Sequence, residues 1–347
     1  MTDLKTIFHT VEAIEPNQSL VPLAAAQLLA LALPALAAAD PRARYAILEF
    51  FKAKIRNAHT RRAYIRAADD FLRFTGERPT GQRLETIRSV DVSDWVAAME
   101  ATGLAAPTIK QRLAAVRMLF RALMEAHSVD TNPAAVVKGP RHSVDIGKTP
   151  VLTGEEVRTL LDSIDCTTLI GLRDRALIAT MAYTFGRIDA ALKVKIEDVL
   201  HQQRRLWLRL HEKRGKTHDV PCHRQLELYL VAYLDRLGIE QLGKLPVFQT
   251  FNREVEENGT VTLRPTGRAM TQGMAWAMLQ RRAKKAGIKT HICNHTFRAT
   301  GITAFLRAGG LLERAAIIAN HASTRTTQLY DRRSREIAWA EIEQISF

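Results

Sequence analysis

The chain has 347 residues, which is enough for two domains that each bury a hydrophobic core. Lys and Arg total 50 against 36 Asp and Glu, and the resulting formal net charge of +14 indicates a polyanionic partner such as nucleic acid. The basic residues are spread along the chain, which disfavours a membrane-surface helix. Three widely spaced cysteines exclude a disulfide framework and fit a reduced cytoplasmic protein.

Residues 1–39 form a leader whose role the sequence leaves open. The run 20–39 is rich in Ala and Leu, but Pro22, Gln27 and Pro34 interrupt it, and acidic residues precede it. A membrane span or an export signal is therefore disfavoured. We expect a short helix that is broken at its prolines.

Residues 40–137 carry apolar side chains at helical spacing, which predicts an all-helical N-terminal domain. Four helices are expected, and Thr60 is the predicted N-cap of the second. Their ranges are 43–54, 60–74, 91–102 and 108–126.

The helix over 108–126 has two contrasting faces. One is an apolar stripe for the core. Another aligns Lys110, Arg117 and Arg121, which form either a solvated surface or, in a chain of this charge, a contact for DNA phosphates. Arg61 and Arg62 are further candidate DNA contacts.

A basic linker is predicted over 138–152, because this stretch lacks an apolar period and contains Gly139-Pro140. A second domain, 153–347, opens with a capping box formed by Thr153 and Glu156. Alternating residues predict a β-hairpin with a basic tip at 213–216. Its strands are expected over 205–210 and 218–222, and helices over 172–184, 224–236, 271–286, 295–308 and 311–319. The predicted fold is mainly α, with two domains and a small antiparallel sheet in the second.

The stretch 291–333 contains groups suited to phosphodiester chemistry. His295 and Arg298 are one helical turn apart, and Tyr330 follows His321 by nine residues. Breaking a phosphodiester requires cations for the phosphate oxygens, a nucleophile, a base and an acid. Each of these residues alone is more often structural, as a helix-capping His or a surface Tyr.

Their order and spacing resemble the tyrosine recombinase, or phage integrase, family. H-T-F-R at 295–298 is similar to the family's H-x-x-R box, and N-H-A-S-T at 320–324 to the box that precedes its nucleophilic Tyr. T-F-G-R-I-D at 184–189 resembles the setting of its first Arg, here Arg187. E-K-R-G-K-T-H-D-V-P at 212–221 resembles its β-hairpin Lys motif, with Lys213 at the catalytic position and Lys216 beside it.

The resemblance covers roughly residues 45–340. It extends into the N-terminal domain, where residues 59–74 and 106–123 are similar to the family's core-binding domain. It implies that Arg187 and Arg298 hold the scissile phosphate and that Tyr330 attacks it to form a 3′-phosphotyrosine. Lys213 is then the acid for the 5′ oxygen, His295 the base for Tyr330 and His321 a donor to the phosphate. No metal, cofactor or ATP is implied.

The implied partner is double-stranded DNA with specific recombination sites, bound by a tetramer in the cytoplasm, at the nucleoid. Two positions depart from the family pattern. Ala190 replaces a frequent acidic residue, so the bracing of the site must come from Asp189 or elsewhere, and Asn320 replaces the Gly before the second His.

Three other interpretations remain open. His291, Cys293 and His295 lie close in sequence, but no second ligand pair is near, which disfavours a metal site. A relaxing enzyme like the type IB topoisomerases would use the same residue types. A DNA-binding regulator derived from a recombinase would need no catalysis, although the complete residue set argues against it.

Overall fold

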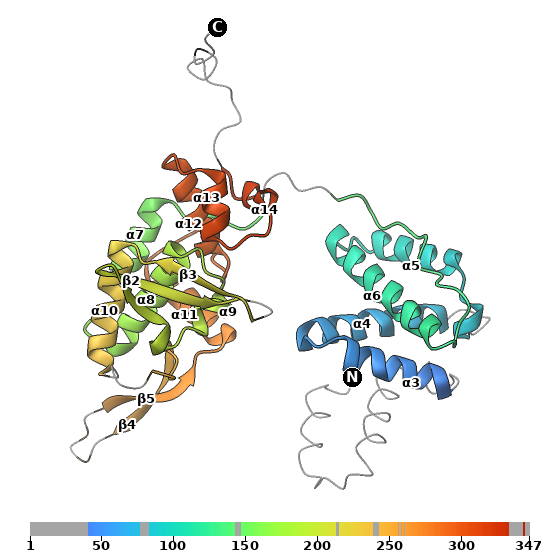
Figure 1. Cartoon of the computed structure of the whole chain (residues 1–347), viewed down its shortest axis with the longest axis horizontal. Coiled ribbons are helices and arrows are strands. Elements are labelled where there is room, and N and C mark those ends of the chain that lie inside the picture. The colour runs from blue at the N-terminus through green and yellow to red at the C-terminus, as the bar shows by residue number, and fades with distance from the viewer. Residues whose placement is uncertain are drawn as a thin grey trace. The chain divides into compact units, whose positions relative to one another are not determined.

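In a computed structural model of the chain, the structure describes residues 41–76, 83–142, 147–212, 215–238, 243–255, 257, 259, 261–332 and 343. The chain divides into two compact units, Met1–Ser143 and Val144–Phe347 (Figure 1). The boundary between the units falls inside the predicted linker 138–152. The leader 1–39 and its expected broken helix lie outside the described residues.

The first unit is helical, as predicted. Its elements are α3 (Pro41–Glu49), the π-helical η2 (Phe50–Lys54), α4 (Ala58–Gly76), η3 (Leu84–Thr86), α5 (Ser89–Ala101) and α6 (Ala106–Glu125). The prediction of Thr60 as an N-cap is wrong. The side-chain oxygen of Asn57 accepts from the backbone N–H groups of His59 (2.9 Å) and Thr60 (3.1 Å), so the helix begins two residues earlier.

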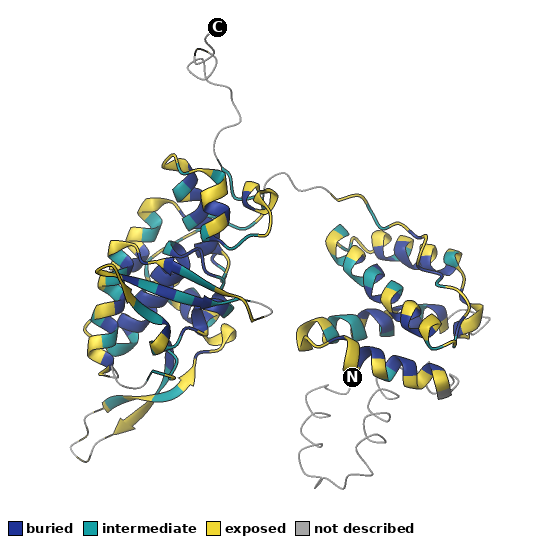
Figure 2. Cartoon of the chain, in the orientation of Figure 1, coloured by how far each residue is buried: buried dark blue, intermediate teal, exposed yellow. Residues whose placement is uncertain are grey.

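The core of this unit lies between α3, α4, α5 and α6, where each helix buries one face (Figure 2). The ring of Phe71 lies 5.0 Å from that of Trp95 and 6.1 Å from that of Phe120, both in edge-on geometry. The apolar stripe predicted for α6 is therefore in the core.

The second unit surrounds α8 (Leu169–Tyr183), which is buried on nearly every side. The other helical elements are α7 (Gly154–Asp162), α9 (Ile188–Leu192), η4 (Ile196–Asp198), α10 (Arg224–Leu237), α11 (Gln272–Lys285), α12 (Thr296–Arg307), α13 (Leu312–Ile318) and α14 (Thr324–Gln328). The capping box is confirmed: Thr153 Oγ1 accepts from Glu156 N at 3.1 Å, and Glu156 accepts from Thr153 N at 2.9 Å.

The predicted β-hairpin is confirmed as β2 (Arg205–His211) and β3 (Thr217–Pro221). It belongs to a three-stranded antiparallel sheet of order β1-β2-β3, where β1 is Val199–Gln202. A second, two-stranded sheet pairs β4 (Gln249–Val255) with β5 (Val261–Ala269). Neither β1 nor this second sheet was predicted from the sequence. Within the described ranges, no helix combines the length and apolarity that a membrane span requires.

Close packing of α12 against α8 positions the functional residues. A Cβ added at Gly301 would lie only 1.9 Å from the carbonyl oxygen of Ala182. A side chain at this position therefore cannot fit, and its absence lets α12 approach α8 and the turn that follows α8.

Candidate active site

Arg298 is the centre of the site. It lies on α12 and is buried, with an exposed fraction of only 2 %. Nη1 donates to the carbonyl of Phe185, and Nη2 donates to that of Ala319 at 2.7 Å. Nη2 also lies 2.6 Å from Nε2 of His321. Burial first, and then the positive charge of Arg187, lower the pKa of Arg298 to about 10, which still leaves it charged at neutral pH.

Arg187 is presented by the turn T-F-G-R after α8. Phe185 in this turn has a left-handed φ of 52°, and Arg187 occupies the N-cap position of α9. Since Arg298 donates to the carbonyl of Phe185, the same turn joins the two arginines. Arg187 Nη1 donates to Glu212 Oε2 at 2.7 Å, and the Glu212 side chain is only 6 % exposed.

Glu212 is a residue that the sequence analysis missed. It follows β2, and its N–H donates to the carbonyl of Lys216 at 2.7 Å, which closes the turn of the hairpin. Glu212 therefore holds the Arg187 side chain in place through this ion pair. Asp189, the other candidate for this role, accepts from Lys193 at 2.6 Å and from Gln272 at 3.3 Å.

His321 follows α13 and lies against Arg298. Asn320, in place of the family's Gly, has φ 49°, a left-handed conformation that Asn tolerates better than most residues. This explains why the departure preserves the turn. Nδ1 of His321 lies 2.8 Å from Oγ1 of Thr327, on α14.

The two bonds of His321 fix its tautomer. Arginine has no acceptor, so Nε2 must be the unprotonated nitrogen that accepts from Arg298. Nδ1 therefore carries the hydrogen and donates to Thr327. Burial, then the charges of Arg298 and Arg187, lower the pKa of His321 to about 4, so the ring is neutral at pH 7. For His321 to donate to a phosphate as expected, Nε2 must acquire a hydrogen when DNA binds, either by protonation of the ring or by a change of tautomer.

Tyr330 lies beside these groups. Its ring centroid is 5.9 Å from that of His321 with the planes nearly parallel (11°). It also lies near enough to Arg298 to oppose the lowering of that residue's pKa. Its carbonyl accepts from Oγ1 of Thr303, on α12, at 2.9 Å. The ring also packs against a small apolar cluster that includes Phe185 and Ile302.

The structure thus brings together Arg187, Arg298, His321 and Tyr330. His295 is exposed at the N-cap of α12, one turn before Arg298, and its carbonyl accepts from Ala299 N at 3.0 Å. Lys213 lies outside the described residues. No cluster of three or more His, Cys, Asp or Glu side chains suited to a metal occurs among the residues that the structure describes.

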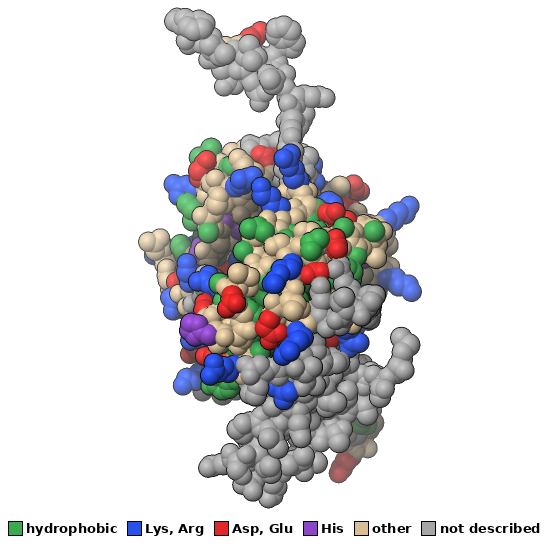
Figure 3. Space-filling model, turned by 90° about the vertical axis from the view of Figure 1, so that its right-hand side faces the viewer, with side chains coloured by type: hydrophobic (Ala, Val, Ile, Leu, Met, Phe, Trp, Pro, Cys, Tyr) green, Lys and Arg blue, Asp and Glu red, His purple; other side chains and the backbone are tan. Residues whose placement is uncertain are grey.

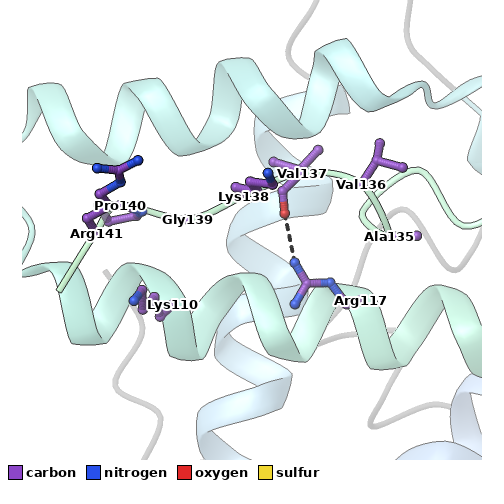
Figure 4. A pocket seen from close by; sticks show the side chains of 9 residues that line it. All are labelled: Lys110, Arg117, Ala135, Val136, Val137, Lys138, Gly139, Pro140 and Arg141. Carbon is purple, nitrogen blue, oxygen red and sulfur yellow. Dashed lines mark hydrogen bonds between the residues drawn. The ribbon is translucent and has the colours of Figure 1, made fainter. Parts of the chain in front are cut away.

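The predicted DNA contacts of the first unit differ in accessibility. Arg117 donates to the carbonyls of Ala134 (3.0 Å) and Val137 (2.8 Å), so it holds the following segment against α6 (Figure 4). Arg61 likewise donates to the carbonyl of Ile55 at 3.1 Å. Arg121 pairs with Glu125 at 3.2 Å. Lys110 and Arg62 are exposed, as is Lys216 on the hairpin of the second unit.

An open basic hollow of about 810 Å³ lies beside α6 in the first unit. Lys110, Lys138 and Arg141 line it, and Gly139 lies against the Lys110 stem, with its added Cβ only 3.2 Å from Cγ (Figure 4). Lys138 and Arg141, which the sequence analysis did not single out, are exposed. On the face visible in Figure 3, Lys and Arg are interspersed with acidic side chains. The charged side chains that line the hollow are, by contrast, all basic.

Comparison with known proteins identifies the class. Residues 150–336 match the phage integrase family, and residues 48–127 match the phage integrase N-terminal SAM-like domain. The chain therefore belongs to the phage integrase family of tyrosine recombinases, enzymes that cleave and rejoin DNA strands in site-specific recombination.

Similar curated proteins are Xer recombinases. The chain is 27% identical to tyrosine recombinase XerD of Listeria innocua over 79% of its own length and 88% of that protein. It is 30% identical to XerD of Mycobacterium leprae over 74% and 77%, respectively. Identity to XerC of Myxococcus xanthus is 26%, over 86% of this chain and 95% of that one.

Solved structures share the fold. The XerH site-specific recombinase bound to a palindromic difH substrate aligns with a TM-score of 0.62 at 19% identity, over 82% of this chain and 78% of that chain. A lambda integrase dimer bound to a COC′ core site aligns with a TM-score of 0.61 at 16% identity, over 85% and 95%. The predicted fold class, a two-domain mainly α protein with small antiparallel sheets, is thereby confirmed.

Proposed function

We propose that this recombinase cuts DNA at specific sites through a 3′-phosphotyrosine on Tyr330, and that it integrates, excises or resolves a mobile element or replicon. The observation that carries the proposal is the stacking of Tyr330 on His321. Nε2 of His321 lies 2.6 Å from the buried guanidinium of Arg298, beside which Arg187 adds a second positive charge. Two guanidinium groups suit the charge of a phosphate in transition, and a phenol beside them is placed to attack it.

The roles follow from this arrangement. Arg298 is held by two backbone carbonyls and His321, so it meets the phosphate with little reorganisation. Arg187 is oriented by Glu212. Lys213, which the sequence predicts to lie on the hairpin turn, is the proposed acid for the 5′ oxygen, and His295 is the proposed base for Tyr330. The covalent link conserves the bond energy, so rejoining requires no nucleotide.

Exposed cations of both units are the proposed DNA contacts. Lys110, with Lys138 and Arg141 in the basic hollow, and Arg62 would bind phosphates, while Lys216 would do so from the hairpin. Three other arginines make intramolecular hydrogen bonds, and their remaining N–H groups are also candidate donors to phosphates: Arg61, Arg117 and Arg121. We propose a tetramer on two DNA sites as the working assembly, which agrees with the lambda integrase tetramer bound to a Holliday junction among the proteins of this fold.

The proposal is tested with nicked duplexes made from the DNA that flanks the gene. Wild-type protein is expected to form a covalent adduct that survives denaturation, and Tyr330→Phe to form none. Tyr45→Phe, a variant of a Tyr that is 70% exposed, is the matched control and should behave as wild type. A gel shift without any adduct would contradict the proposal and support a DNA-binding regulator. A plasmid that carries two sites then tests resolution and excision, which act within one DNA molecule. Two plasmids that carry one site each test integration, which joins two molecules.

A further inference from the structure

The end of the interdomain linker contacts the stretch that carries Tyr330. Gly147 N donates to the carbonyl of Leu329 at 2.7 Å. The guanidinium of Arg332 donates to the carbonyls of Gly147 and, at 3.2 Å, Thr149. These bonds lie immediately before and two residues after Tyr330, so the linker holds the backbone on both sides of that residue.

The fit at Gly147 is close. A Cβ added there would lie 2.7 Å from the carbonyl oxygen of Leu329, a separation that real Cβ atoms essentially never show. The neighbour is backbone, so it cannot move aside as a flexible side chain would. Any other residue at 147 must therefore shift either its own backbone or that of Leu329, which adjoins Tyr330.

Helix α12 anchors the same stretch from another direction. Thr303 Oγ1 donates to the carbonyl of Tyr330 at 2.9 Å. Oγ1 of Thr300, three residues earlier on α12, accepts from Leu152 N at 3.0 Å, where the linker enters the catalytic unit. Because α12 also carries Arg298, the linker, the nucleophile segment and the phosphate-binding arginine are tied to one helix.

We propose that residues 147–149 are a positioning element for the nucleophile: they fix the backbone of 329–332 so that the Tyr330 phenol stays beside Arg298. This inference rests on the proposed role of Tyr330. Gly147 and Arg332 are positioning residues rather than catalytic ones. Displacing a nucleophile by about 1 Å can slow a reaction about 100-fold, so loss of either contact affects the chemical step more than DNA binding.

The test uses the full-length chain with Gly147→Ala, Arg332→Ala and Arg332→Lys. Gly154→Ala, whose added Cβ would come no closer than 3.9 Å to a neighbour, controls for the glycine substitution. Arg236→Ala, at an exposed position in the last turn of α10, controls for loss of one charge. Two quantities are measured for each: DNA affinity by gel shift, and the first-order rate of adduct formation on the nicked duplex at saturating protein.

We expect Gly147→Ala and Arg332→Ala to slow adduct formation about tenfold or more while affinity stays within about twofold of wild type. Arg332→Lys keeps the charge but replaces the planar guanidinium, whose Nη2 donates to both carbonyls, with a flexible ammonium, so an intermediate rate is expected. If Gly147→Ala does not fold, the two Arg332 variants decide the matter.

Three results would overturn the inference. The first is a wild-type adduct rate in Arg332→Ala, and the second is a loss that appears only in affinity. The third is a wild-type rate in Arg332→Lys together with a slow Arg332→Ala, which would show that charge alone matters. Failure of the proposed function looks different, because then wild-type protein forms no adduct or Tyr330→Phe still forms one.

Discussion

Acid is expected to destabilise the catalytic unit through His321. Burial and two neighbouring arginines lower the pKa of His321 to about 4, whereas an unfolded imidazole titrates near its ordinary value of 6.5. Between these two values the unfolded chain binds a proton that the native site does not. The stability that the neutral ring contributes is therefore complete above about pH 6.5 and is lost as the pH falls toward about 4.

The magnitude follows from the gap between the two pKa values. A gap of about 2.5 pH units corresponds to about 3.5 kcal/mol at most, since each unit is about 1.4 kcal/mol. His321 is only partly buried, so solvent screening reduces the effect, and we expect about 1–2 kcal/mol.

The assay compares urea unfolding of wild type and His321→Gln at pH 7 and pH 4.5. The Gln amide oxygen can accept from Arg298 but does not titrate, so all other acid effects cancel in the difference. Wild type should lose about 1–2 kcal/mol more than the variant over this interval. Equal losses, or an NMR titration of the His321 ring near pH 6.5, would refute the reasoning.

Two further predictions concern the supports of the site. Thr327→Val removes the acceptor for Nδ1–H of His321, so Arg298 alone holds the ring and adduct formation should slow about tenfold, while Thr327→Ser keeps the hydroxyl and retains most activity; a wild-type rate of adduct formation in Thr327→Val would count against this role. Gly301→Ala places a Cβ 1.9 Å from a backbone oxygen of α8, and we expect a loss of about 3 kcal/mol and a Tm lower by roughly 6–12 °C, measured by calorimetry beside Gly154→Ala; equal Tm values in the two would contradict the α8–α12 contact.

Much of the helical framework could be predicted from the sequence, because long amphipathic helices leave a repeated signal. The stripe on α6 and the capping box at Thr153 are such cases. The second sheet left a weaker signal: β4 and β5 are largely exposed and polar, so apolar alternation is nearly absent. The clearer indication of a hairpin in the sequence was Gly259, a turn residue between the two strands.

The site residues divide in the same way. Arg187, Arg298, His321 and Tyr330 were predicted because their spacing follows a family pattern, and the structure brings them together. The residues that hold these four side chains in place follow no such sequence pattern. Glu212 acts across 25 positions, and Thr303 across 27, so only the tertiary structure pairs them with the residues they hold.

The hydrogen bonds of Arg298 have a consequence for genetic experiments. This side chain joins the carbonyls of Phe185 and Ala319, which are 134 residues apart in sequence, so it is also a cross-link inside the catalytic unit. Truncating it leaves two buried carbonyls without their charged donor, at about 1–3 kcal/mol each. An Arg298→Ala allele would therefore report reduced protein abundance as well as lost chemistry. Tyr330→Phe, which keeps the ring, is the cleaner inactive allele for complementation.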